Sequence, residues 1–246
     1  MKSLVAYITA GFPSSNFTID LALSLKEAGV DSLELGIPFS DPVADGPIIE
    51  RANLEALKNG FKLEQLFEIS DAIAKEIDTL WMGYFNSFYH RGFDNFSSRA
   101  KQSGVSGFII PDLPHEEAVA YVPTMEKKDL ALISFVAPTD SKERIKEVVE
   151  HSKKFIYLVA YAGITGSGAS EDLSQTIENI RAITTTPIHV GFGVDEKTAK
   201  DKAKGVDGVI VGSAFVKILL DDSISDGEKI KRISNSARII KESINS

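Results

Sequence analysis

The sequence has no cysteine among its 246 residues, which excludes disulfides, thiolate zinc sites and cysteine nucleophiles. It has four histidines, without a metal-ligand spacing such as that of a HExxH pair, so we expect no metal. No apolar run approaches the ~18 residues of a membrane span. Basic residues are outnumbered as well, with 27 Lys and Arg against 35 Asp and Glu, a net charge of −8. This balance is a poor match for a protein that binds nucleic acid or anionic membranes.

What is present is an ordinary globular composition, with 43% hydrophobic and 25% charged residues. The lack of cysteine fits a reducing cytosol, and also other compartments; we expect a cytoplasmic protein. The apolar stretch that follows Met1 and Lys2 and runs to Phe12 indicates a strand and not a signal peptide, because only one basic residue precedes it and no A-x-A-like cleavage site follows.

Short apolar runs alternate with helical segments along the whole chain. Eight runs are expected to be strands: Leu4–Thr9, Ser32–Leu35, Leu80–Tyr84, Gly107–Ile110, Ala131–Val136, Phe155–Val159, Ile188–Val190 and Gly208–Val211. Helices are expected between them, with apolar residues at three- and four-residue spacing: Asp20–Ala28, Leu63–Lys75, Phe93–Lys101, Glu116–Lys127, Lys142–Glu150 and Leu173–Ile183. Eight such units in 246 residues predict a closed (β/α)8 barrel, the TIM-barrel fold, in preference to an open doubly wound sheet. Without a linker or low-complexity segment, residues 1–246 are expected to form one domain.

Three helix-to-strand joints read almost alike, around Gly29, Gly104 and Gly205. In each, a glycine follows the helix and an apolar run begins within a few residues. We expect these glycines to adopt the left-handed conformation that caps a helix. The recurrence indicates a repeated unit of helix and parallel strand.

Glu34 is a charged residue inside an apolar strand. If Leu33 and Leu35 face the outer helices, Glu34 faces the barrel lumen. Burial there would raise the pKa of its carboxyl, which suits a group that gives and takes a proton near neutral pH. The alternative is a structural carboxylate paired with a Lys or Arg.

Asp41 and Asp45 follow in the loop Pro38–Pro47. Asp beside Pro or Gly often only caps a turn, and this interpretation is favoured for Asp41. For Asp45 a functional role is favoured, because the three prolines of the loop lower the entropy cost of holding a carboxylate in place.

Glycine-containing loops follow the last three expected strands, at 162–169, 191–193 and 212–214. Barrels often bind phosphate through the loops after strands seven and eight, where glycines let backbone N–H groups approach the anion. Each loop alone would also fit a helix cap or a turn. Together they predict a phosphate site.

The segment Leu33–Pro47 resembles the tryptophan synthase alpha subunit family. Further matches extend over nearly the whole chain: Tyr7–Pro13, Tyr84–Asn86, Pro111–Pro114, Gly163–Gly166, Gly191–Gly193 and Val211–Ala214. The resemblance implies a barrel that cleaves indole-3-glycerol phosphate into indole and glyceraldehyde 3-phosphate, without a cofactor of its own. It also implies an alpha2beta2 assembly in which indole passes to a beta subunit that carries pyridoxal phosphate and forms tryptophan.

The resemblance also implies residue roles. Glu34 matches the general acid/base, and Asp45 matches a partner carboxylate expected to stay ionised, its pKa held low. The substrate-binding matches are Tyr7, Tyr84, Ile109 and Phe192 at the indole pocket, Tyr157 beside the glycerol, and Thr165; the phosphate-binding matches are Gly166, Gly193, Gly212 and Ser213. For the aromatic residues, plain core packing is an equally good interpretation.

Two departures from the family accompany these matches: no helix is expected before the first strand, and Tyr161 stands where some relatives carry a basic residue. The loops after the second and sixth strands are candidate lids. The first of them and the segment Asp112–Pro114 lie where the family contacts its beta subunit, so weak turnover alone and strong activation by that partner are expected.

Three alternatives to this function exist. Another phosphate-binding barrel, such as an indole-glycerol phosphate synthase or a phosphoribosyl isomerase, would use a lumenal lysine or paired aspartates, and the eight strands contain no lysine. A regulatory or scaffold subunit is disfavoured by the presence of both Glu34 and Asp45. A free-standing indole lyase stays open, because its chemistry would need the same residues.

Overall fold

The computed structural model describes residues 1–160 and 173–246. Its strands are β1 Ser3–Thr9, β2 Ser32–Gly36, β3 Asp78–Met82, β4 Gly107–Ile109, β5 Ala131–Leu132, β6 Ser134–Val136, β7 Ile156–Val159, β8 Ile188–Gly191 and β9 Gly208–Val211. Its helices are α1 Ser15–Glu27, α2 Pro47–Lys58, α3 Leu63–Ile73, α4 Phe85–Tyr89, α5 Phe93–Ser103, α6 His115–Ala118, the 3₁₀ turn η1 Val119–Tyr121, α7 Val122–Lys127, α8 Lys142–Val149, α9 Ser174–Arg181, α10 Ala199–Lys202, α11 Ser213–Leu219 and α12 Asp226–Ile244.

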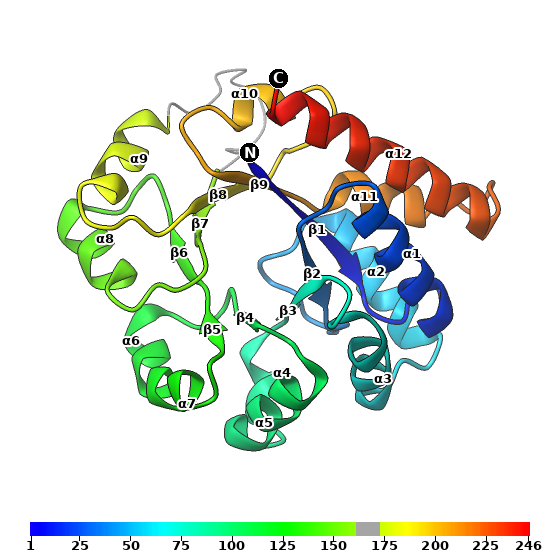
Figure 1. Cartoon of the computed structure of the whole chain (residues 1–246). Coiled ribbons are helices and arrows are strands. Elements are labelled where there is room, and N and C mark those ends of the chain that lie inside the picture. Colours follow the sequence, from blue (N-terminus) through cyan, green and yellow to red (C-terminus); the bar gives the residue numbers. More distant parts are fainter. Residues whose placement is uncertain (161–172) are drawn as a thin grey trace.

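The described strands form one parallel sheet in the order β5-β4-β3-β2-β1-β9-β8-β7-β6. Strands β5 and β6 belong to one segment that is interrupted at Ile133, whose backbone N–H donates to the Phe108 carbonyl at 3.0 Å. The two ends of the sheet therefore meet, and helices surround it (Figure 1). The predicted (β/α)8 barrel is confirmed.

Several predicted elements differ in their bounds, with α1 beginning at Ser15 and not at Asp20, and three of the differences have a clear form. The third strand is Asp78–Met82 and not Leu80–Tyr84, because Ser32 pairs with Asp78 and the ladder to β2 ends at Met82. The expected strand Ala131–Val136 is split into β5 and β6. The helix expected over 116–127 is divided into α6, η1 and α7, with Pro123 in the first turn of α7, where its missing N–H costs nothing.

The predicted left-handed glycines are confirmed at all three helix-to-strand joints. Gly29, Gly104 and Gly205 have φ angles of 93°, 85° and 75°. An L side chain strains this conformation, so each glycine lets the chain turn from a helix directly into the next strand.

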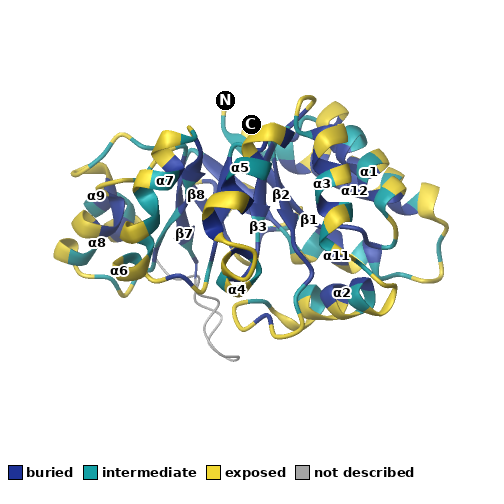
Figure 2. Cartoon of the chain, turned by 90° about the horizontal axis from the view of Figure 1, so that it is seen from below, coloured by how far each residue is buried: buried dark blue, intermediate teal, exposed yellow. Residues whose placement is uncertain are grey.

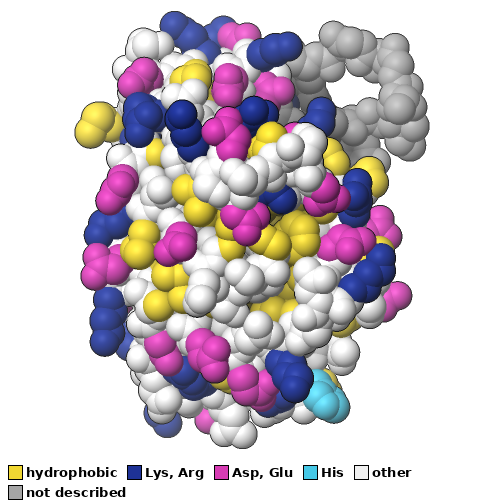
Figure 3. Space-filling view, turned by 90° about the vertical axis from the view of Figure 1, so that its right-hand side faces the viewer, with side chains coloured by type: hydrophobic (Ala, Val, Ile, Leu, Met, Phe, Trp, Pro, Cys, Tyr) yellow, Lys and Arg dark blue, Asp and Glu magenta, His cyan; other side chains and the backbone are white. Residues whose placement is uncertain are grey.

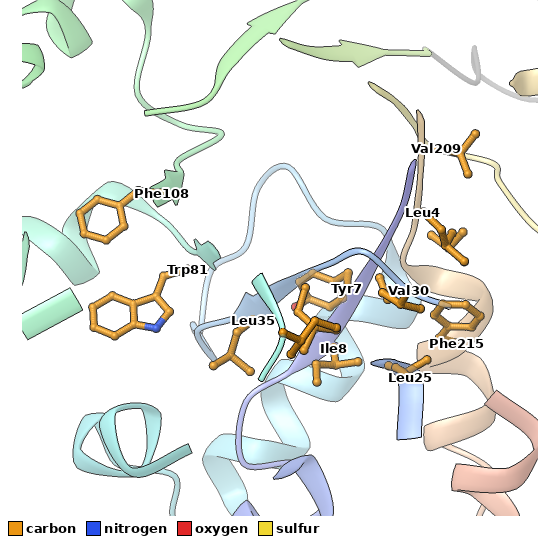
Figure 4. Close-up of a cluster of buried hydrophobic side chains, with 14 of the residues drawn as sticks. Leu4, Tyr7, Ile8, Leu25, Val30, Leu35, Trp81, Phe108, Val209 and Phe215 are labelled. Carbon is orange, nitrogen blue, oxygen red and sulfur yellow. The ribbon is translucent and has the colours of Figure 1, made fainter. Parts of the chain in front are cut away.

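Apolar side chains pack on both faces of the sheet. The outer face contributes Leu33 and Leu35 to a layer beneath the helices, whereas Leu80 and Ile210 pack inside the barrel. Figure 4 shows part of the outer layer, in which Trp81 lies beside Phe108 with ring planes only 4° apart. Alternate residues of a strand thus serve two cores, as the barrel requires.

Seen from below, the buried strands lie inside a shell of partly exposed helices (Figure 2). The chain ends lie on one side of the molecule, and α2 and α4 lie on the opposite side, toward which the strands run. On the face in Figure 3, positive and negative side chains are interspersed among hydrophobic ones. No helix in the described ranges is long and apolar enough to cross a membrane.

Candidate active site

A cavity of about 260 Å³ opens at the carboxyl ends of the strands. It is lined by Tyr7, Glu34, Ala44, Asp45, Gly46, Pro47, Ile48, Ile49, Met82, Ile109, Pro111, Phe135, Tyr157, Phe192, Gly193, Val194, Ile210, Gly212 and Ser213. The structure thus brings nine of the predicted site residues to one cavity: Tyr7, Glu34, Asp45, Ile109, Tyr157, Phe192, Gly193, Gly212 and Ser213. Two further predicted residues, Thr165 and Gly166, lie outside the described residues.

Glu34 projects from β2 into the lumen, as the alternation of the strand predicts. Its side chain is 3% exposed, and Oε1 has no hydrogen-bond partner among the described residues. Burial, and secondarily the charge of Asp45, raises the pKa of Glu34 to about 8. No described Lys or Arg forms an ion pair with it, which disfavours a structural carboxylate. The carboxyl is therefore predominantly protonated at neutral pH.

Asp45 lies in the loop between β2 and α2. Burial raises the pKa of Asp45 to about 6, while hydrogen bonds from Tyr84 and Asn53 lower it. The Asn53 amide is 3.4 Å from Oδ2. The expectation that the Asp45 pKa is held low was therefore wrong, because desolvation outweighs these two donors. The pKa of Asp45 nevertheless stays below that of Glu34, so the two carboxyls can hold different charges at pH 7.

Two tyrosines each reach over a glycine at the end of the adjacent strand: Tyr7 of β1 over Gly36 of β2, and Tyr157 of β7 over Gly191 of β8. A Cβ placed on Gly36 would lie 2.3 Å from Tyr7 Oη, and one on Gly191 would lie 2.3 Å from Tyr157 Oη. Any side chain at either glycine would displace a phenol from the cavity. Burial is the main cause that raises the pKa of both tyrosines, so both hydroxyls stay protonated.

An aromatic wall closes one side of the cavity. The Phe135 and Tyr157 rings stack at 5.0 Å, and Phe192 meets Tyr157 edge-on at 6.2 Å. Sequence reasoning did not select Phe135, nor its fellow lining residues Met82 and Pro111. Their place among the last residues of a strand or just after it was the only signal in the sequence.

Tyr84 is not among the residues that line the cavity, although the resemblance places it at the indole pocket. Its hydroxyl accepts a hydrogen bond from the Ala44 N–H at 3.0 Å, and its ring stacks on Phe39 at 5.2 Å. Tyr84 therefore fixes the loop that carries Asp45.

Small residues form another part of the cavity lining. Gly193 has φ 68°, and a Cβ there would meet no atom within 4 Å. Gly212 and Ser213 stand at the start of α11. Among the described residues, no group of three His, Asp or Glu could hold a metal ion.

Fold and cavity together define a (β/α)8-barrel protein with two inequivalent carboxyls in its mouth. The family model of the tryptophan synthase alpha chain matches residues 1–245, and the chain belongs to this family, whose members are lyase-type enzyme subunits. The resemblance found in the motifs is thereby confirmed.

Individual relatives and solved structures support this family assignment. The tryptophan synthase alpha chain of Wolinella succinogenes is 58% identical over 247 residues, covering 100% of this chain and 97% of the relative. The solved structure of the alpha subunit from Campylobacter jejuni has a TM-score of 0.87 at 35% identity, covering 97% and 95% of the two chains. A tryptophan synthase structure from Mycobacterium tuberculosis has a TM-score of 0.89 at 30% identity, covering 100% and 93%.

Proposed function

We propose that this chain is the alpha subunit of a tryptophan synthase and cleaves indole-3-glycerol phosphate by a retro-aldol reaction. The observation that carries the proposal is the pair of carboxyls, Glu34 and Asp45, that share one cavity with different pKa values of about 8 and 6. Carboxyls whose environments separate their pKa values can divide acid and base roles at neutral pH. Family membership supplies the substrate class.

In this mechanism, protonated Glu34 gives its proton to the indole ring carbon that carries the side chain. Ionised Asp45 accepts a hydrogen bond from the ring N–H as the ring becomes an electron-poor indolenine. The bond between the ring and the glycerol carbon then breaks, and its electron pair restores the aromatic ring. The Glu34 carboxylate takes the proton of the adjacent hydroxyl, which becomes the aldehyde of glyceraldehyde 3-phosphate. Glu34 ends protonated and ready for another turnover.

The other lining residues have complementary proposed roles. Tyr7, Ile109 and Phe192 provide walls for the indole ring, and Tyr157 lies beside the glycerol. Backbone N–H groups at Gly193, Gly212 and Ser213 would hold the phosphate without a cation. Nothing in this proposal assigns a cofactor to this chain, and pyridoxal phosphate belongs to the beta subunit.

Glu34→Gln tests the central step. The amide keeps the shape of the carboxyl but has no proton to give, so cleavage is expected to fall by at least about 10²-fold while ligand binding changes little. Indole release and binding of a substrate analogue measure the two quantities. Substantial residual turnover would contradict the proton role.

A second experiment tests the partner. Indole release from indole-3-glycerol phosphate is measured with the purified chain alone and after a beta subunit is added. Slow release that rises sharply with the partner supports the synthase subunit. Equally fast release in both conditions would favour the free-standing lyase, and no release in either would show that the substrate is wrong.

A further inference from the structure

The ring of Tyr7 crosses the cavity from the phosphate side to the carboxyl side. A Cβ on Gly212, after β9, would lie 3.6 Å from Tyr7 Cβ, whereas one on Gly36, at the end of β2, would lie 2.3 Å from Oη. Strand β1 lies between β2 and β9, so the Tyr7 side chain reaches from one neighbouring strand to the other. The hydroxyl therefore sits above the strand that carries Glu34.

Tyr7 and Glu34 are direct partners in the ladder between β1 and β2. Partners in a parallel ladder project on the same face of the sheet, and both of these side chains line the cavity. Glu34 Oε1 is buried without a hydrogen-bond partner among the described residues. A carboxylate formed at that position needs a nearby donor, because an unpaired buried charge is costly.

Few groups in the cavity can be that donor. The titratable groups that face Glu34 are Tyr7 from β1, Asp45 from the loop after β2 and Tyr157 from β7, with Tyr84 behind Asp45. Of the two tyrosines, Tyr157 places its hydroxyl over Gly191 of β8, whereas Tyr7 places its hydroxyl over Gly36 of the strand that carries Glu34. No Lys or Arg is among the described residues that line the cavity. Burial first, and then the charge of Asp45, raises the pKa of Tyr7, while a hydrogen bond with Thr9 lowers it; the net shift is upward, so the hydroxyl keeps its proton.

We propose that Tyr7 is a positioning residue whose hydroxyl donates a hydrogen bond to Glu34 when that carboxyl has given up its proton. The consequence for turnover rests on the proposed function; the hydrogen bond itself does not. Tyr7 transfers no proton: its O–H bond stays intact while Glu34 gives one proton to the ring carbon and takes one from the substrate hydroxyl. The hydrogen bond holds the carboxylate in place and favours its ionised form.

Tyr7→Phe removes one oxygen and keeps the ring. Because a donor to the charged form is lost, the pKa of Glu34 is expected to rise by about one unit. In the chain alone, kcat is expected to fall about tenfold with little change in KM, since a hydrogen bond to a charged group is worth about that factor or more. The alkaline limb of the pH profile should move upward by the same unit.

The matched control is Tyr89→Phe, which removes the same atom from an exposed side chain on α4 and should leave kcat and the pH profile unchanged. Gly36→Ala provides a second variant, because its Cβ displaces the Tyr7 phenol without removing the hydroxyl. It should shift the alkaline limb in the same direction as Tyr7→Phe. Circular dichroism verifies that each variant is folded.

NMR titration of the ligand-free chain labelled with ¹³C at the glutamate carboxyls separates this inference from the proposed function. Comparison with Glu34→Gln assigns the Glu34 signal. A higher Glu34 pKa in Tyr7→Phe supports the hydrogen bond, and an identical pKa in both chains overturns it, whatever the substrate. A wild-type chain that releases no indole, by contrast, would contradict only the proposed function.

Discussion

At the scale of single residues, the Glu34 and Asp45 pKa values of about 8 and 6 predict how activity depends on pH. Glu34 must be protonated to act as the acid, so activity falls as pH rises through about 8. Asp45 must be ionised to accept from the ring N–H, so activity falls as pH drops through about 6. We expect a bell-shaped profile of kcat/KM with its maximum between these values, and its limbs belong to the coupled pair.

A pair of asparagine variants tests the acid limb. Asp45→Asn should lower kcat and abolish the decline below about pH 6, because no carboxylate remains there to be protonated. Asp41→Asn alters an exposed acid in the same loop and should leave the profile as in the wild type. An acid limb that persists in Asp45→Asn would assign it to another group.

The residue scale also shows what the sequence could predict. Glu34 was recognisable because a lone carboxylate interrupts an apolar strand, and alternation alone places it in the lumen. The expectation of a low pKa for Asp45 was wrong. The burial of a loop residue depends on which elements cover it, and its neighbours in the sequence do not reveal those elements. Phe135 was missed because one aromatic residue in a strand is equally compatible with either core.

At the scale of elements, the Tyr84 side chain, from the turn after β3, holds the loop between β2 and α2. Tyr84→Phe removes the acceptor of the Ala44 N–H and a donor to Asp45. We expect faster hydrogen exchange at Ala44, a several-fold fall in kcat/KM and a loss of about 1 kcal/mol in unfolding free energy. Tyr89→Phe again serves as the control. Unchanged exchange at Ala44 would mean that Tyr84 does not fix the loop.

The sequence predicts the ends of a helix or strand well where local chemistry alone determines them. The glycines at 29, 104 and 205 mark helix ends by their conformation, whatever the rest of the fold. Strand β3 begins two residues earlier than expected, because Asp78 and Thr79 look like a loop and only pairing with β2 makes them strand. Buried Thr79 satisfies its hydroxyl locally, on the Ile77 carbonyl at 2.9 Å.

At the scale of the whole molecule, His189 inside the barrel makes folding sensitive to acid. Burial lowers its pKa from 6.5 to about 4, against the opposing charges of Asp207 and Asp31. The unfolded chain therefore binds the proton more tightly, and the contribution of His189 to stability falls by about 3 kcal/mol as pH drops from about 6.5 to 4. In urea unfolding, the stability of His189→Asn relative to the wild type should rise by about that amount over this range, whereas exposed His90→Asn should stay parallel to the wild type.

Glu34 has the opposite dependence, because the folded state binds its proton more tightly than the unfolded chain. Its stability contribution is complete below about pH 4.5 and is lost as pH rises to about 8, a loss of a few kcal/mol. Glu34→Gln cannot ionise, so we expect it to be more stable than the wild type at pH 8.5 and nearly equal at pH 4.5. Urea unfolding followed by the fluorescence of Trp81, the chain's single and fully buried tryptophan, measures both differences. A stability gap that is the same at both pH values would show that the folded barrel does not raise the pKa of Glu34. A gap confined to high pH, together with lost cleavage, would show that the barrel gives up stability to keep a proton donor in its lumen.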